Sequence, residues 1–182
     1  MKKENTVKYV ARLAITLLII AAVMAAALAG INSVTAPIIA QLKAEKTQAA
    51  IEAVLPGGGD PVGFSDDSGI VTTVYQGESG WAVEVAPVGF DSAITMMVGI
   101  DNEGNVLGID IISHKETAGL GAVAAADTAA GEAFRTQYVG KSGVLAVSKD
   151  GGEIDALTGA TITSRAVTAG VNAALAVVAN MG

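Results

Sequence analysis

An uncharged run near the N-terminus constrains this chain more than any other feature. Nineteen residues from Leu13 to Ile31 carry no charged side chain, and a helix of that length, at about 1.5 Å per residue, spans the hydrocarbon core of a bilayer. Arg12 and three lysines precede the run, and basic residues beside a membrane helix favour the cytoplasmic side. The sequence therefore predicts a single-pass protein of the cell (inner) membrane with a cytoplasmic N-terminus. A cleaved signal peptide is the alternative, because small residues near the end of the run offer cleavage sites.

The charge divides along the chain in the same way. Residues 1–40 have a net charge of +3, whereas residues 41–182 carry seven basic and seventeen acidic side chains, a net charge of −10. This asymmetry fits a protein whose two ends face different compartments. The acidic body and the low aromatic content, 4 %, argue against nucleic acid as a partner.

The chain contains no cysteine and only one histidine. Disulfides, thiolate zinc sites, Cys-ligated iron–sulfur clusters and Cys nucleophiles are therefore excluded. One histidine is too few for a zinc site, so we expect no metal centre.

Turn and periodicity signals divide the remainder into short elements. Pro37 is expected to end the membrane segment, and residues 38–55 have the pattern of an amphipathic helix that stops at the Pro- and Gly-rich stretch 56–61. Alternating residues on either side of Gly-containing turns predict two β-hairpins. The predicted ranges are strands 70–75 and 81–86, strands 94–100 and 106–112, helix 123–138, strand 143–148 and helix 164–180.

These elements indicate an α+β fold of short antiparallel strands and flanking helices, preceded by one N-terminal transmembrane helix. We expect three parts: a cytoplasmic stub and transmembrane anchor over residues 1–36, a linker helix over residues 37–56 and an extracytoplasmic domain over residues 57–182.

The stretch 155–164 carries the most chemical information. Four hydroxyl side chains surround Gly159, directly before the predicted C-terminal helix. In the simpler interpretation they are helix caps and turn residues. In the functional interpretation they hold or bind a phosphate, because the N–H groups and the dipole at a helix N-terminus attract an anion. Asp155 could then orient or deprotonate a threonine hydroxyl.

A second candidate stretch covers residues 113–121, a polar and Gly-rich loop directly after a predicted strand. Such loops often bind ligands, although an ordinary surface turn is the alternative. A Ser–His–Asp triad is conceivable on composition, but the G-x-S-x-G motif is missing, as are the phosphate-binding motifs G-x-x-x-x-G-K-[ST] and G-x-G-x-x-G. Residues 89–94 form a third, weaker candidate.

The three stretches, in this order, resemble the FMN-binding domain of the Rnf complex G subunit and of the C subunit of the Na⁺-translocating NADH:quinone reductase. Residues 158–161 (Thr-Gly-Ala-Thr) are similar to the family's S/T-G-A-T flavinylation motif. Residues 114–121 are similar to its H-x-E-T-P-G-L-G motif, with Ala118 in place of the proline. Residues 89–94 follow the family's G-Y-x-G-P-I only loosely, and the short chain suits the Rnf protein better.

The resemblance implies that FMN is attached through a phosphoester to Thr161 by a separate ApbE-type flavin transferase, which uses FAD and Mg²⁺. It also implies that this protein is an electron carrier without a catalytic acid–base pair of its own. The cofactor-binding residues that it implies are His114, Glu116, Thr117, Leu120, Gly121, Asp155, Thr158, Gly159, Ala160 and Thr161.

The function implied by the resemblance is that of the covalent-FMN electron-transfer subunit of a membrane-bound Rnf-type ferredoxin:NAD oxidoreductase coupled to ion translocation. Its partners would be the other membrane subunits and the flavin transferase. Two alternatives stay open. One is a stand-alone anchored flavoprotein for extracytoplasmic electron transfer, and the other is a membrane-anchored binding module without redox function, in which the Thr-rich turn is only a helix cap.

Overall fold

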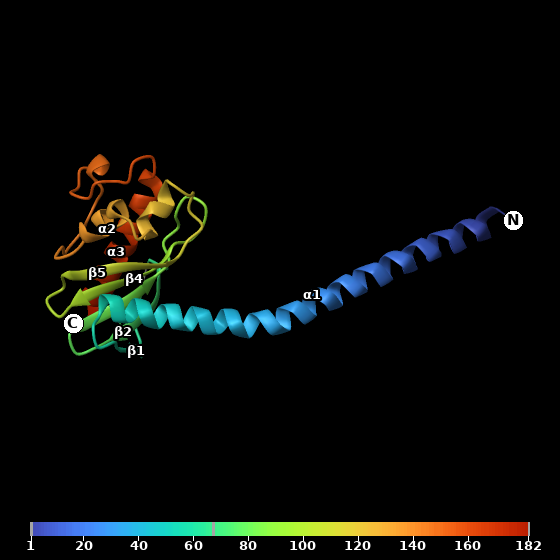
Figure 1. Ribbon diagram of the computed structural model, residues 1–182, viewed down its shortest axis with the longest axis horizontal. Coiled ribbons are helices and arrows are strands. Elements are labelled where there is room, and N and C mark those ends of the chain that lie inside the picture. Colours follow the sequence, from blue (N-terminus) through green and yellow to red (C-terminus); the bar gives the residue numbers. More distant parts are fainter. Residues whose placement is uncertain (1, 67, 182) are drawn as a thin grey trace. The chain divides into compact units, whose positions relative to one another are not determined.

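The computed structural model describes residues 2–66 and 68–181, with side chains from residue 8 onward. The chain forms two compact units, Met1–Glu45 and Lys46–Gly182. Helix α1 (Lys2–Val54) accounts for the described part of the first unit, and its last turns belong to the second (Figure 1).

Within the first unit, α1 exposes its apolar side chains. Leu17 is 68 % exposed, and its apolar neighbours are similar. Thr16 and Ser33 donate their hydroxyl hydrogens to the carbonyls of Arg12 and Gly30, each at 2.8 Å, so these polar side chains are satisfied inside the helix, as a bilayer requires. The helix is long and apolar enough to cross a membrane.

The expected end of the membrane helix at Pro37 is wrong, because α1 continues through Pro37 to Val54. Proline removes one backbone hydrogen-bond donor, but its fixed φ is compatible with a helix. The helical segments before and after Pro37 are long, so the helix continues despite the lost hydrogen bond. The helix ends instead beside Pro56 and Gly57, where φ is +96°, as the stretch 56–61 predicts. The proposed domain limits at residues 36 and 56 stay predictions.

The second unit is built on a five-stranded antiparallel sheet in the order β1-β2-β3-β4-β5. Both predicted hairpins are confirmed, and a short edge strand, β1, is added to them. The strands are β1 (Asp60–Val62), β2 (Val71–Gln76), β3 (Gly80–Val85), β4 (Thr95–Asp101) and β5 (Val106–Ser113).

Local hydrogen bonds explain why the β4–β5 hairpin is predictable. The Asp101 carboxylate accepts the backbone N–H groups of Glu103 and Asn105, each at 2.8 Å. Gly104 adopts φ +83°, a left-handed conformation that glycine reaches without a steric penalty. The turn is therefore specified by the residues within it.

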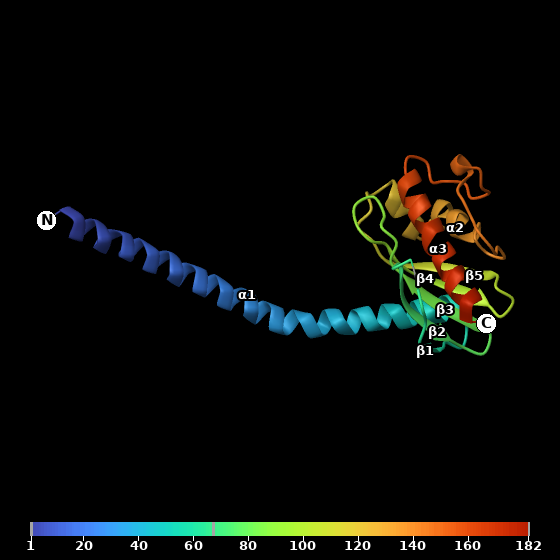
Figure 2. The ribbon, with the colours of Figure 1, turned by 180° about the vertical axis from the view of Figure 1, so that it is seen from behind.

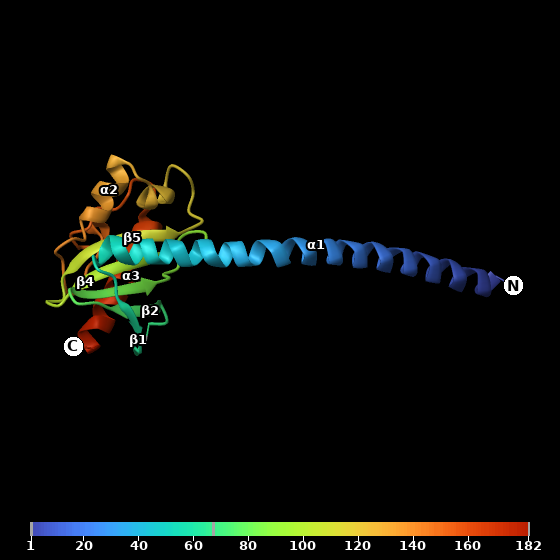
Figure 3. The same ribbon diagram turned by 60° about the horizontal axis from the view of Figure 1, so that its bottom comes forward.

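Each face of the sheet is covered by a helix. On one face, Met96, Val98 and Ile100 of β4 join the apolar cluster that contains the buried side of α3 (Thr161–Met181) (Figure 2). On the other face, Met97 packs with the last turns of α1, at residues 50–55 (Figure 3). Alternate residues of one strand thus point to opposite helices, which confirms the α+β class. Helix α3 is also long and apolar, but 67 % of its most apolar segment is buried inside the protein. It is therefore the core helix of this unit.

The single helix predicted over residues 123–138 is wrong, because two short helices replace it. They are η1 (Gly121–Ala125), a 3₁₀ helix, and α2 (Ala129–Thr136). Ala126 and Thr128 are extended, and the Thr128 hydroxyl accepts the N–H of Gly131 at 3.3 Å. A new N-cap therefore restarts the helix.

The strand predicted over residues 143–148 is also wrong. The backbone N–H and C=O of Leu145 bond to the Asn172 side chain of α3, each at 2.8 Å, instead of to a neighbouring strand. Only an isolated bridge joins Val147 to Ile154, and a 3₁₀ turn, η2 (Ser148–Asp150), follows. Helix α3 begins at Thr161, three residues before its predicted start at Ser164.

Candidate functional site

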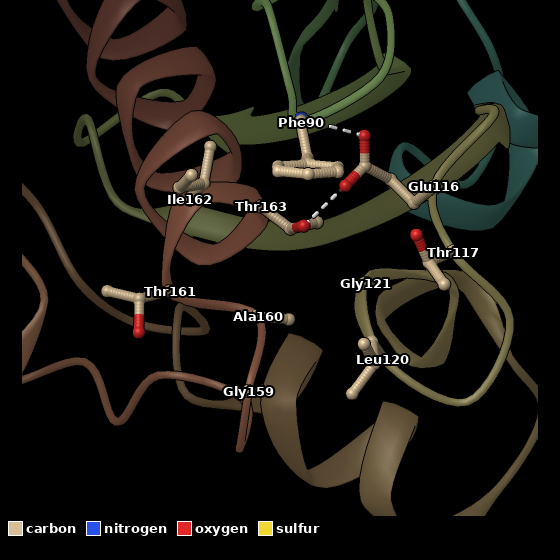
Figure 4. Close-up of a pocket in the computed structure, with 10 residues that line it drawn as sticks. All are labelled: Phe90, Glu116, Thr117, Leu120, Gly121, Gly159, Ala160, Thr161, Ile162 and Thr163. Carbon is tan, nitrogen blue, oxygen red and sulfur yellow. Dashed lines mark hydrogen bonds between the residues drawn. The ribbon is translucent and has the colours of Figure 1, made fainter.

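The register of the sheet brings two of the candidate stretches together. Val85 of β3 pairs with Met96, and Thr95 pairs with Ser113 at the end of β5. The loop after β3 and the loop after β5 therefore leave the sheet at the same end. The first turn of α3 lies beside both loops (Figure 4).

A cavity of about 260 Å³ lies among these three segments. Its lining combines apolar side chains, hydroxyls and glycines, and it includes seven of the ten predicted cofactor-binding residues. The lining residues are Phe90, Glu116, Thr117, Leu120, Gly121, Gly159, Ala160, Thr161, Ile162 and Thr163.

The buried carboxylate of Glu116 joins all three segments. Its Oε1 accepts the backbone N–H of Phe90 at 2.9 Å and that of Asp91 at 3.3 Å. Its Oε2 accepts the hydroxyl of Thr163 in α3, as Figure 4 shows. Both carboxylate oxygens are therefore engaged by the protein, and Glu116 shapes the cavity by fixing its walls.

Two glycines let the segments approach closely. A Cβ at Gly121 would lie 2.7 Å from Oε2 of Glu116, so a larger residue would displace the carboxylate. Gly159 adopts φ +74°, and a Cβ there would lie 3.0 Å from the Leu120 side chain. The turn before α3 and the loop after β5 thus meet at Gly159 and Leu120.

Thr161 is half-buried and is the first residue of α3. Its Oγ1 accepts a hydrogen bond from Nζ of Lys149 at 3.0 Å, and its hydroxyl is directed away from the Glu116–Thr163 pair (Figure 4). The first N–H groups of a helix have no carbonyl partner within it. Thr161 therefore lies where both a helix end and an ammonium group favour an anion.

The remaining three predicted residues lie outside the cavity lining. Thr158 and Asp155 are exposed, and the backbone N–H of Asp155 donates to the Gln137 side chain at 2.7 Å. His114 accepts the backbone N–H of Glu116 through Nδ1 at 3.2 Å. The histidine thereby stabilises the loop that carries Glu116, and Asp155 is open to another protein at the surface.

Sequence reasoning missed two residues and undervalued two others. Lys149 contacts Thr161, and Ile162 lines the cavity. Thr163 belongs to the Thr-rich stretch but was not among the predicted cofactor-binding residues, and Phe90 belongs to the weakest candidate stretch; both line the cavity. Phe90 is 66 % exposed and lines the cavity, and ligand pockets are lined predominantly by apolar and aromatic side chains. Lys149 gave no comparable signal in the sequence.

Comparison with known proteins identifies the family. An FMN-binding domain model matches residues 89–176, a range that contains every cavity residue. The G subunit of the Na⁺-translocating ferredoxin:NAD⁺ oxidoreductase complex of Acetobacterium woodii is 34 % identical, over 96 % of this chain and 94 % of its own. This chain belongs to that family of G subunits.

Other G subunits support the assignment. The G subunit of an ion-translocating oxidoreductase complex of Methanosarcina acetivorans is 32 % identical over 92 % of this chain and 94 % of its own. The G subunit of the proton-translocating ferredoxin:NAD⁺ oxidoreductase complex of Clostridium ljungdahlii is 41 % identical over 52 % of this chain and 51 % of its own. The resemblance to the Rnf G subunits is thereby confirmed. Together with the exposed apolar α1, it indicates a membrane protein.

The cavity of this protein fits an FMN ring. Phe90, Leu120 and Ile162 provide apolar contact for a flat aromatic system, while Thr117 and the helix end provide polar groups. A side chain at position 121 would collide with Glu116 and Thr163 and so disturb one wall. The site therefore matches the FMN-binding domain assigned by the family model.

Proposed function

We propose that this chain is the electron-transfer G subunit of a membrane-bound, ion-translocating ferredoxin:NAD oxidoreductase and that it carries FMN as a phosphoester on Thr161. The position of Thr161 supports this proposal most directly. Thr161 lines the cavity of about 260 Å³, and its hydroxyl lies at a helix N-terminus, 3.0 Å from the ammonium group of Lys149.

The attachment reaction is a phosphoryl-type transfer from FAD, performed by a separate flavin transferase of the ApbE type with Mg²⁺. Oγ1 of Thr161 forms a bond to the phosphorus of the FMN half, and the bond from that phosphorus to the bridging pyrophosphate oxygen breaks. AMP leaves with the bridging oxygen, and the hydroxyl proton is released. Asp155 and Thr158 are exposed beside the target, so we assign them to recognition by the transferase.

The bound FMN would supply one- and two-electron redox chemistry. The residues of this chain hold and orient it. Phe90, Leu120 and Ile162, which line the cavity, would provide apolar contact for its ring system, and Thr117 would offer a hydroxyl. Glu116 keeps the three segments in place, and His114 holds the loop on which Glu116 lies.

Intact mass and in-gel flavin fluorescence test the attachment. The full-length chain, expressed with its transferase, should gain the mass of FMN less one water and should fluoresce on a denaturing gel. The Thr161→Ala variant should lose both signals, whereas Thr136→Ala, which removes an exposed hydroxyl of α2 outside the motif and the cavity, should keep the mass gain. An unmodified wild-type chain, or a Thr161→Ala chain that retains flavin, contradicts the proposal. Co-purification with integral-membrane subunits tests membership of the complex.

We further propose a single membrane crossing with the flavin domain outside the cytoplasm. The basic residues before the span and the acidic body after it support this orientation. Because the chain has no native cysteine, a single cysteine reports one position. A membrane-impermeant maleimide should label Ser79→Cys in intact spheroplasts and Thr6→Cys only after permeabilisation. The reverse pattern would mean the opposite orientation.

A further inference from the structure

The side chain of Lys149 approaches the hydroxyl of Thr161. Lys149 lies in the 3₁₀ turn η2, twelve residues before Thr161, and its Nζ is 3.0 Å from Oγ1. The two residues belong to different elements, so their contact depends on how the turn packs beside α3.

The η2 turn is fixed on both sides. Asp150 accepts two hydrogen bonds from Arg165 of α3, at 2.6 and 2.7 Å. The backbone N–H of Ser148 donates to Ile154 at 2.7 Å, and Gly151 closes the turn with φ +85°. A bidentate carboxylate–guanidinium pair sets orientation as well as distance, so the backbone of Lys149 is held beside the first turn of α3.

Among the described residues, Lys149 is the cation that donates a hydrogen bond to Thr161. Arg165 follows Thr161 by one helical turn, but its guanidinium is paired with Asp150. Lys141 is paired with Glu153 at 2.6 Å. Lys149 instead donates to the hydroxyl oxygen.

We infer that Lys149 is a positioning residue for the modification of Thr161, and that its ammonium group neutralises the charge of the phosphoryl group attached there. This inference rests on the proposed function. Esterification replaces a neutral hydroxyl by a diester with one negative charge, because one P–O bond to Oγ1 forms while the P–O bond to AMP breaks. A lysine ammonium is a mobile point charge with three donors, suited to phosphate oxygens. It would attract the phosphoryl group during transfer and hold the diester afterwards.

A rate measurement and a spectroscopic measurement test the inference. With limiting transferase and FAD, the full-length Lys149→Gln chain should gain FMN mass more slowly than wild type by about threefold, the size expected for one exposed ion pair. Lys149→Arg should restore most of the rate, because it keeps the charge. Added salt should slow wild type more than Lys149→Gln, because it screens the charge. In chains loaded to completion, the ³¹P resonance of Lys149→Gln should differ from that of wild type.

Lys141→Gln is the matched control. It removes one lysine charge from the same part of the chain, where the partner is Glu153 and not Thr161. Its rate and ³¹P resonance should equal those of wild type. Because Lys149 is exposed, the fold of Lys149→Gln should be intact, which the fluorescence of Trp81 in β3 checks.

Failure of the inference and failure of the proposed function give different results. If wild type is modified at Thr161 while Lys149→Gln matches it in rate, salt dependence and ³¹P resonance, the role of Lys149 is refuted and the proposed function stands. A rate effect without a ³¹P difference refutes the contact with the attached phosphoryl group. If wild type acquires no FMN at Thr161, both are refuted.

Discussion

Replacing Glu116 by alanine should destabilise the flavin domain by about 3 kcal/mol, because three donors lose their acceptor at once. The donors are the backbone N–H groups of Phe90 and Asp91 and the hydroxyl of Thr163. They come from two segments far apart in the sequence. Glu116 is 7 % exposed, so little water can replace its carboxylate.

The magnitude follows from opposing contributions. A hydrogen bond to a charged group contributes roughly 1.5–3 kcal/mol. The loss of three such bonds would by itself cost more than about 3 kcal/mol. Truncation to alanine, however, also removes the cost of burying a carboxylate, which is several kcal/mol. Glu116→Gln should cost only about 1 kcal/mol. Its amide oxygen can still accept from Phe90, and its amide nitrogen can donate to the Thr163 hydroxyl oxygen.

Urea unfolding followed by Trp81 fluorescence measures the effect. Trp81 is the only tryptophan and lies in β3, so the signal reports on the flavin domain. With an m-value of about 2 kcal/mol/M, Glu116→Ala should lower the unfolding midpoint by about 1.5 M. The exposed Glu103→Gln should change stability by less than about 0.5 kcal/mol.

Two results would refute this reasoning. One is a Glu116→Ala midpoint equal to that of wild type, which would mean that the carboxylate does not hold the loops. The other is additivity of Glu116→Gln and Thr163→Val, since residues in direct contact should show a coupling free energy. If the role of Glu116 is to hold the walls, Glu116→Gln should still acquire FMN at Thr161, as intact mass would show.

Three further predictions concern the turns and the cavity rim. Gly159→Ala should lose about 1–2 kcal/mol in the same urea assay, because φ is +74° and the new Cβ meets Leu120. Hydrogen bonds, chiefly from the Asn105 backbone N–H, lower the pKa of Asp101. The ionised carboxylate therefore stabilises the fold fully at pH values above the unfolded-state pKa of about 4. This contribution to stability is lost as the pH falls through the lower folded-state pKa. The stability difference between wild type and Asp101→Asn should therefore shrink as the pH falls from about 5 through the folded-state pKa, and a constant difference would contradict the assignment. Phe90→Ala should change stability by less than about 0.5 kcal/mol but should increase iodide quenching of the flavin in FMN-loaded protein, because Phe90 covers one wall of the cavity; unchanged quenching would place the ring elsewhere.

The elements that the sequence predicted correctly are specified by nearby residues. The hairpin at Asp101 and Gly104 is determined by side-chain-to-backbone hydrogen bonds and one left-handed glycine inside the turn. The incorrect elements depend on distant partners. Residues 143–148 have strand composition, but Asn172 of α3 satisfies the backbone of Leu145. Such a tertiary contact overrides local propensity.

The candidate site shows the same division between local and distant information. The motifs identified Thr161 and the loop of Glu116, and the family assignment supports the FMN-binding role of this region. The motifs did not reveal that Glu116 bonds to Phe90 and Thr163, 26 and 47 residues away. Resemblance suggested a flavin contact for Glu116, whereas its geometry indicates a residue that holds the walls of the cavity.

The convergence of the three segments follows from the topology once the two hairpins are known. In an antiparallel meander the end of β3, the start of β4 and the end of β5 lie at the same end of the sheet. The loops that carry Phe90 and Glu116 are therefore neighbours. The position of α3 is set by a different cause, the packing of its apolar face on the sheet. The Asp150–Arg165 pair then brings Lys149 to Thr161. Breaking that pair with Asp150→Asn should therefore slow modification of Thr161 without changing the cavity walls, because the Glu116 contacts do not involve the η2 turn. A normal modification rate in Asp150→Asn would mean that the turn reaches α3 by other contacts.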